Sequence, residues 1–225
     1  MINDLTIFVN SHSSADDALR VFIFQLEKHW PNHPPIVIGR DGLMYVFPKC
    51  GYTVVDYSAA KQFTSQYLMG LCAVETPYAL TMQEDFILFG DVDEAGIDGA
   101  MDDLNNAYSA RLIDSGRELT YSMQATVWDS HVLRLIYALI DAASPWEAEL
   151  CADLIFRDFG RSRELCKLRH DDHLPMRGRN HRDSPIFPYI STALVRGKWN
   201  HEYRNELTPL LEQYGIDAEK RGWSA

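Results

Sequence analysis

Three consecutive polar residues, Gln83, Glu84 and Asp85, follow an apolar run that begins after Pro77. The run is typical of a buried strand, and open α/β sheets bind their ligands at the carboxyl ends of such strands. A carboxylate pair at this position suits a divalent cation. Mg²⁺ or Mn²⁺ would need only one or two protein carboxylates if a phosphate-bearing donor supplied other ligands. The spacing thus indicates a metal site at Asp85, although a strand end followed by a solvated acidic loop explains it about equally well.

A second pair of acids opens a predicted helix. Ser144 is a helix-capping residue type and Pro145 suits the first helical position, so Glu147 and Glu149 lie in the first turn. Acids there complement the helix dipole, which is the simpler interpretation. The functional interpretation makes one of them a general base at the mouth of the site. Trp146 would then stack on a sugar ring, or else be a core aromatic.

Other polar groups have the types that a phosphorylated ligand needs. Gln124 could form a hydrogen bond with a polar acceptor. Arg196 and Lys198 could attract a diphosphate, and Gly197 between them permits a close approach of the backbone. The histidines and aspartates at 170–173 show neither H-E-x-x-H nor zinc-finger spacing, which favours a charged loop over a metal cluster.

The elements that must position these groups follow from apolar spacing. A strand at Leu5–Val9, an amphipathic helix up to about Trp30 and a strand at Ile36–Ile38 form a predicted βαβ unit. Further strands are predicted at 45–47, 53–55, 78–88, 107–113, 120–126 and 185–194, and further helices at 59–74, 97–104, 131–143, 146–156 and 203–214. The interval 157–182 is predicted to be charged and loop-like. This alternation predicts an α/β fold with a mixed, mostly parallel sheet.

Composition narrows the class of protein. The chain has 225 residues, is 46% hydrophobic and carries a formal net charge of −11, which argues against a general nucleic-acid binder. One small phosphate site needs only local positive charge. The cysteines lack C-x-x-C spacing, no signal peptide is recognised and no apolar run is long enough for a transmembrane segment. We therefore expect a cytoplasmic protein, and the sequence leaves its oligomeric state open.

Neither a repeat nor a low-complexity linker divides the chain. We expect a single domain over 1–225, with a core at 1–156 and a charged loop, strand and helix at 157–225 that close the site. The G-x-S-x-G, Walker and G-x-G-x-x-G motifs do not occur in the sequence. Serine hydrolysis, P-loop phosphotransfer and the standard dinucleotide fold are therefore poorly supported.

The order of the motifs carries a resemblance that none of them carries alone. The chain resembles glycosyltransferases of the GT-A fold, in the branch of small bacterial or viral polysaccharide enzymes. The resemblance spans nearly the whole chain. The matching segments, in order, are the Asn10-Ser11 turn, the helix that carries Gln66, Pro77–Asp85, Gln124–Trp128, Pro145–Leu150, Phe187–Ile190 and Val195–Trp199.

The resemblance implies a single Rossmann-type α/β/α domain. It also implies a transferase that moves a sugar, with inversion, from a nucleoside-diphosphate-sugar donor to the hydroxyl of a glycan or another acceptor. The D-x-D element of the family falls on Gln83–Asp85, where only the last acid is kept, so Asp85 and the donor diphosphate would hold Mn²⁺ or Mg²⁺.

Site roles follow from the same resemblance. The acceptor-site E-D-x-x-L element falls on Trp146–Leu150, which makes Glu147 the base and Glu149 the second candidate, and Gln124 and Trp146 would meet the acceptor. The residues expected to meet the donor are Asn10, Ser11, Asp41, Gln66, Gln83, Glu84, Asp85, Arg196 and Lys198.

Two other functions remain open from the sequence. A nucleotidyltransferase also uses carboxylates at strand ends on an α/β sheet, but its glycine- and arginine-rich phosphate loop is absent, because residues 10–17 hold neither glycine nor arginine. The second alternative is a non-catalytic binding protein that keeps the fold and has lost the chemistry, which the incomplete D-x-D element allows.

Overall fold

A computed structural model describes residues 2–42, 51–58, 60, 62–113, 120–159, 164–168, 174, 176–177 and 181–225. Its centre is a seven-stranded sheet of order β3-β2-β1-β4-β7-β6-β8. The strands are β1 (Leu5–Asn10), β2 (Ile36–Arg40), β3 (Tyr52–Asp56), β4 (Tyr78–Gln83), β6 (Ala107–Arg111), β7 (Thr126–Asp129) and β8 (Glu164–Leu168). Only β7 runs against its neighbours in this sheet, so the prediction of a mixed, mostly parallel sheet is confirmed.

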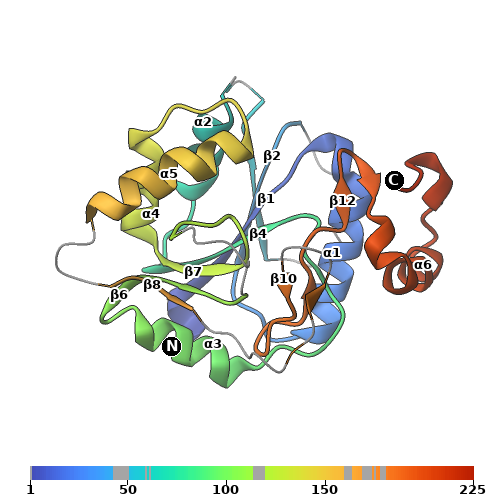
Figure 1. Cartoon of the computed structure of the whole chain (residues 1–225), viewed down its shortest axis with the longest axis horizontal. Coiled ribbons are helices and arrows are strands. Elements are labelled where there is room, and N and C mark those ends of the chain that lie inside the picture. The colour runs from blue at the N-terminus through green and yellow to red at the C-terminus, as the bar shows by residue number, and fades with distance from the viewer. Residues whose placement is uncertain are drawn as a thin grey trace.

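Helices cover both faces of the sheet (Figure 1). One face carries α2 (Phe63–Leu71), α4 (Ser130–Leu139) and α5 (Pro145–Phe159), and the other carries α1 (Asp16–His29) and α3 (Glu94–Asp103). β1 and β2 read as near-continuous apolar runs because both of their faces are buried. The three-layer α/β/α arrangement therefore matches the predicted fold class.

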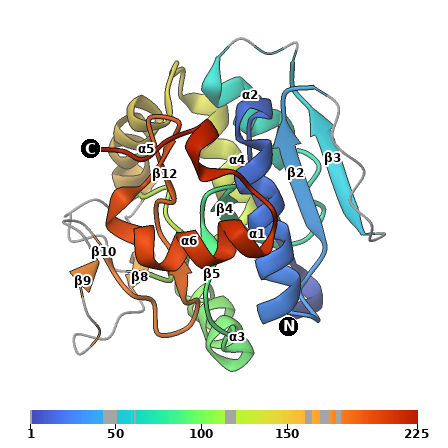
Figure 2. The same ribbon diagram turned by 90° about the vertical axis from the view of Figure 1, so that its right-hand side faces the viewer.

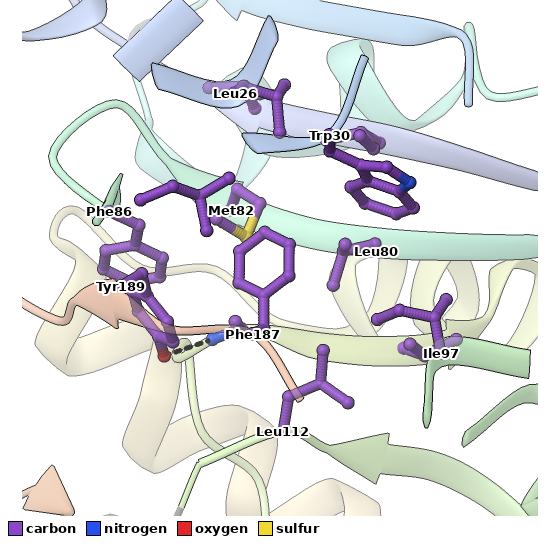
Figure 3. Packing of buried hydrophobic residues seen from close by; sticks show 14 of the residues in the cluster. Leu26, Trp30, Leu80, Met82, Phe86, Ile97, Leu112, Phe187 and Tyr189 are labelled. Atoms are coloured by element: carbon purple, nitrogen blue, oxygen red, sulfur yellow. Dashed lines mark hydrogen bonds between the residues drawn. The ribbon is translucent and has the colours of Figure 1, made fainter. Parts of the chain in front are cut away.

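The core beneath α1 is rich in aromatic side chains. Figure 3 shows Trp30, the residue that follows α1, and Phe187 near Leu80 of β4, with Phe86 and Tyr189 close to Phe187. The Trp30 and Phe187 rings meet edge to face with centroids 6.0 Å apart, the favourable geometry for aromatic quadrupoles. This packing fixes the segment around Phe187 against the middle of the sheet.

The C-terminal part of the chain forms an outer layer over α1 (Figure 2). It contains three short strands, β11 (Tyr189–Ile190), β12 (Leu194–Val195) and β13 (Lys198–Trp199), and the helix α6 (Arg204–Gln213). β11 pairs with β5 (Ile87–Leu88), and β12 pairs with β13 as a hairpin. The remaining elements are β9 (Met176–Arg177), β10 (His181–Arg182) and 3₁₀ turns at Ile2–Asp4, Ser13–Ala15, His201–Tyr203 and Ala218–Lys220.

Several predicted elements have different bounds. The strand expected at 78–88 is two strands, since Glu84 and Asp85 turn the chain and β5 pairs with β11 outside the central sheet. The prediction of a strand at 120–126 is wrong, because β7 begins only at Thr126. The backbone before Thr126 is held by hydrogen bonds to residues far away in the sequence. The interval expected to be a loop after residue 157 contains the edge strand β8, which pairs with β6.

Other expectations meet mixed outcomes. The predicted strand at 45–47 and the histidine–aspartate cluster at 170–173 lie outside the described residues. The helix at Pro145 and the C-terminal helix are confirmed. Within the described ranges, every helix is either too short or too polar to cross a membrane. The division of the chain at residue 156 stays a prediction.

Candidate active site

The site lies at the point where the strand order of the sheet reverses. β1 is followed through α1 by β2 on one side, whereas β4 pairs with the other side of β1, so the carboxyl ends of β1 and β4 meet at a crossover point. Asn10 and Gln83, the last residues of these strands, are register partners. The Asn10 Nδ2 group donates to Gln83 Oε1 at 3.3 Å. This is the position at which doubly wound sheets bind ligands.

Two buried oxygen atoms at this point have no hydrogen-bond partner in the described part of the chain. Asn10 is 9% exposed and Ser11 is 1% exposed. Asn10 Oδ1 and Ser11 Oγ form no hydrogen bond with any residue that the structure describes. Buried polar atoms are nearly always paired with protein, water or ligand, and each exception needs an explanation. The pair therefore marks a place where a polar partner from outside the described chain fits.

Asp41 joins the end of β2 to the turn between β1 and α1. Its carboxylate accepts the Ser13 N–H at 2.6 Å and the Ser13 hydroxyl at 2.8 Å, and His12 Nε2 lies 3.3 Å away. Burial acts to raise the pKa of Asp41, but the hydrogen bonds from Ser13 and the charge of His12 outweigh it and leave this pKa below its ordinary value. Asp41 therefore stays ionised and acts here as a clamp on the turn.

Tyr57, just after β3, completes this edge. Its buried hydroxyl donates to the backbone carbonyl of Ser11. Burial raises the pKa of Tyr57, and the nearby charges of Glu84 and Asp41 raise it further. Tyr57 thus lies close to both acids and remains neutral. Nothing in the local sequence around Tyr57 distinguishes it from a core aromatic, so it could not be predicted as a site residue.

Glu84 and Asp85 form a carboxylate pair at the turn after β4. Burial raises the pKa of Glu84 to about 8, and the neighbouring Asp85 adds to the rise. Burial also raises the pKa of Asp85 to about 7, opposed by the Leu194 N–H, which donates to Asp85 Oδ2 at 3.1 Å. Two adjacent, half-buried acids with raised pKa values form a pair whose negative charge is poorly compensated, which a bound cation would relieve.

Arg196 and Lys198 lie on a tight hairpin above Asp85. The hairpin starts where the Ala193 and Leu194 N–H groups bind the backbone and side chain of Asp85. Its two turn residues, Arg196 and Gly197, have φ values of 51° and 78°. This is the type I′ pattern, in which both central residues are left-handed. A non-glycine residue in that region costs roughly 1 kcal/mol, so the turn holds Arg196 at some expense in stability.

The predicted acceptor residues lie around β7 and α5. Gln124 bonds to the C-terminal layer: its Oε1 accepts the Tyr189 hydroxyl at 3.0 Å and its Nε2 donates to Ser191 O at 3.4 Å. Glu149 accepts the Met123 N–H at 3.0 Å. These contacts show that both side chains shape the segment before β7, whatever they bind in addition.

Glu147 and Trp146 are more open. Glu147 is exposed in the first turn of α5, where its Oε2 accepts the Ala143 N–H at 2.9 Å and its own N–H donates to Ser144 Oγ at 3.3 Å. The predicted capping interaction is therefore present. Trp146 is 72% exposed, which excludes the core alternative for this side chain. Gln66, on the first turns of the neighbouring α2, donates to Ala60 O at 3.1 Å.

The structure thus gathers most of the predicted donor residues at one edge of the sheet. Asn10, Ser11, Asp41 and the turn after β4 lie together at the carboxyl ends of β1, β2 and β4. Glu147 belongs to α5, which lies on the face of the sheet opposite α1. No hydrogen bond or ion pair among the described residues joins Glu147 to Asp85. Figure 1 shows α5 and β12 on opposite sides of this edge.

The residues present fit a hard cation only in part. No group of three or more metal-binding side chains occurs within the described ranges. Glu84 and Asp85 supply two carboxylates, which suffice for Mg²⁺ or Mn²⁺ when phosphate oxygens and water complete the coordination. They do not suffice for a metal held by protein alone.

Comparisons with known proteins bear on the fold. Neither a protein-family model nor a curated protein matches the sequence. Among solved structures, residues 1–349 of TarS from S. aureus align with a TM-score of 0.56 and 9% identity, over 96% of this chain and 68% of that one. The fold is similar to that of a GT-A glycosyltransferase.

Two further structures agree with this result. The TarS fragment solved with UDP-GlcNAc aligns with a TM-score of 0.54 and 10% identity, over 79% of this chain and 57% of that one. A 2-C-methyl-D-erythritol 4-phosphate cytidylyltransferase from Thermus thermophilus aligns with a TM-score of 0.50 and 8% identity, over 74% of this chain and 88% of that one. At such identities the likeness establishes a shared fold, and the chemistry has to be argued from the residues of this site.

Proposed function

We propose that the protein transfers a sugar from a nucleoside-diphosphate-sugar donor to an acceptor hydroxyl. The observation that carries the proposal is the pair of oxygens of Asn10 and Ser11 that no described residue satisfies, buried at the crossover point beside the Glu84–Asp85 pair. Ribose hydroxyls and base N–H groups can donate to such oxygens. A diphosphate bound next to them would lie within reach of both the acids and the hairpin cations.

Each group has one task in this proposal. Asp85, with Glu84 beside it, would hold Mg²⁺ or Mn²⁺, which when bound supplies Lewis-acid stabilisation of the departing diphosphate. Arg196 and Lys198 would neutralise the same phosphates directly. Glu147 would take the proton of the acceptor hydroxyl from the other side of the site, and the exposed indole of Trp146 would stack on an acceptor sugar.

A second candidate function rests on the fold. The likeness to a cytidylyltransferase at a TM-score of 0.50 makes a nucleotidyltransferase the alternative. In that case the chain would bind a nucleoside triphosphate together with a sugar phosphate. Against it stands the turn after β1, which offers His12, Ser13 and Ser14 and no arginine or glycine for a triphosphate.

A donor screen separates these functions. The protein is titrated by calorimetry with nucleoside diphosphates, nucleoside triphosphates and the matching sugar nucleotides, with and without MnCl₂. UDP and UDP-GlcNAc come first because TarS was solved with the sugar nucleotide. We expect a diphosphate or sugar nucleotide to bind, and binding to weaken at least tenfold in Asn10→Ala. Preference for a triphosphate favours the nucleotidyltransferase. If none of these nucleotides binds, both proposed enzyme functions are refuted.

A further inference from the structure

Arg221, near the C-terminus, joins three separate parts of the molecule. Its Nε donates to Asp17 Oδ2 at 2.7 Å and its Nη2 to Asp17 Oδ1, in the first turn of α1. The same Nη2 donates to the Ser14 carbonyl in the turn after β1. Its Nη1 donates to the Gly197 carbonyl at 3.0 Å, at the tip of the hairpin. One guanidinium group therefore bridges the hairpin to the β1–α1 turn.

The surroundings of Arg221 hold it in this geometry. Its side chain is only 14% exposed. The guanidinium carbon lies 5.8 Å from the centre of the Trp199 ring, which is fully buried at the base of the hairpin. Main-chain hydrogen bonds fix the neighbouring residues, because Trp199 N donates to Gly222 O at 3.0 Å and Ser224 N donates to Trp199 O at 2.8 Å. A planar fork with several partners is a rigid connection that a lysine cannot reproduce.

We propose that Arg221 is a positioning residue for the donor, which holds the cations Arg196 and Lys198 against the β1–α1 turn so that they face a bound diphosphate. The inference rests on the proposed function, because it assigns Arg221 a role toward that donor. It makes the C-terminal segment part of the donor site, although residue 221 is far from every other site residue in sequence. Arg221 acts through the hairpin and does not need to touch the ligand.

The position of the hairpin explains why a clamp is needed. The base of the hairpin is fixed at Asp85, but its tip carries two exposed cations. The backbone of one of them, Arg196, has a left-handed conformation. The contact with Gly197 O is at that tip. Arg221 also lies close enough to Glu84 that its charge lowers the pKa of that acid against the larger effect of burial. Arg221 therefore lies near both the tip of the hairpin and Glu84.

A double-mutant cycle tests the inference. Affinity for the best-binding nucleoside diphosphate is measured by calorimetry with MnCl₂ present, for wild type, Arg221→Ala, the pair Arg196→Ala with Lys198→Ala, and the triple variant. We expect Arg221→Ala to weaken binding about tenfold or more, and less than about twofold in the background that lacks the two cations. A purely structural role would give similar losses in both backgrounds and would overturn the proposal.

Two further variants serve as a conservative substitution and as a control. Arg221→Lys keeps the charge and should fold even where Arg221→Ala does not, and we expect it to lose most of the affinity; wild-type affinity in this variant overturns the proposal. Arg20→Ala removes another arginine that joins α1 to the C-terminal layer, through the Tyr214 carbonyl at 3.0 Å. Its contacts, with the Tyr214 carbonyl and the Phe24 ring, do not involve the hairpin, so this variant should bind like wild type.

Hydrogen exchange separates the failure of this inference from that of the proposed function. In the ligand-free protein, Arg221→Lys should speed amide exchange at Gly197 and Lys198 at least tenfold, while amides of β1 stay protected. Faster exchange without any nucleotide binding in wild type means that the proposed function is wrong and the donor role falls with it. Nucleotide binding in wild type with unchanged exchange and affinity in the variant refutes the role of Arg221 alone.

Discussion

Replacing Asp85 by Asn separates what this residue does for the fold from what it does for the ligand. An Asn oxygen can still accept the Leu194 N–H that now bonds to Asp85 Oδ2 at 3.1 Å. The negative charge, however, is removed. Burial raises the pKa of Asp85 from 3.8 to about 7, so the folded protein favours the protonated acid. The stability that protonation provides is complete below about pH 4 and is lost as the pH rises through 7.

The expected change in stability follows from the rise in the pKa of Asp85. Each tenfold weakening of the acid corresponds to about 1.4 kcal/mol, so the rise corresponds to at most about 4 kcal/mol at pH 8. Because Asp85 is partly exposed and shares its site with Glu84, we expect Asp85→Asn to stabilise the metal-free protein by about 1–2 kcal/mol. For a chain of this length that raises the unfolding midpoint by roughly 2–8 °C. The same variant should lose its stabilisation by Mn²⁺ and a nucleoside diphosphate.

The assay is thermal unfolding of wild type and Asp85→Asn at about pH 5 and about pH 8, with and without Mn²⁺ and nucleotide. Asp102→Asn, on the exposed side of α3, is the matched control and should match wild type throughout. The gain in Asp85→Asn should be smaller at the lower pH. Equal destabilisation at both pH values, or undiminished stabilisation by metal and nucleotide, would refute the reasoning.

Three further predictions concern Glu147, Asp153 and the Glu84–Asp85 pair. Glu147→Gln should lower the rate of sugar transfer at least about 100-fold while donor affinity stays within about twofold, and full activity would end the assignment of the base. Asp153→Ala removes the acceptor of two N–H groups before β7, one buried and one partly buried, and should cost about 2–4 kcal/mol in urea unfolding, whereas exposed Asp158→Ala should cost almost nothing. Equal costs would contradict that role. Mn²⁺ affinity should rise between about pH 6 and pH 8, since the cation needs the ionised forms of Glu84 and Asp85, and a flat profile would exclude them as ligands.

Local pattern was sufficient for the elements that build the first half of the sheet. The strands around Leu5, Ile36 and Tyr78 have apolar runs that are buried on both faces, and the helix between the first two has a regular apolar stripe. These signals are local, so the βαβ unit and the carboxyl end of β4 could be placed in advance. The grouping of Asn10 with Gln83 was implied by the resemblance to GT-A glycosyltransferases, and the register of β1 and β4 agrees with it.

Elements set by distant contacts could not be predicted. β7 begins at Thr126 because Asp153, Glu149 and the Tyr189 hydroxyl bind the backbone N–H groups before it, and no local signal reports those bonds. β8 lies at the edge of the sheet, and its sequence, Glu-Leu-Cys-Lys-Leu, lacks a regular alternation of apolar and polar residues. Arg221 was missed for the same reason, since its partners are about 24 to 207 residues away along the chain.

The central claim is that a nucleoside diphosphate and its cation bind at the carboxyl ends of β1 and β4. A crystal structure with Mn²⁺ and the best-binding nucleotide, with manganese located by anomalous scattering, tests it most directly. We expect the metal on Asp85, the diphosphate between Asp85 and the Arg196–Lys198 hairpin, and the nucleoside beside Asn10. A nucleotide bound at any other edge of the sheet, with the Glu84–Asp85 pair untouched, would contradict the account.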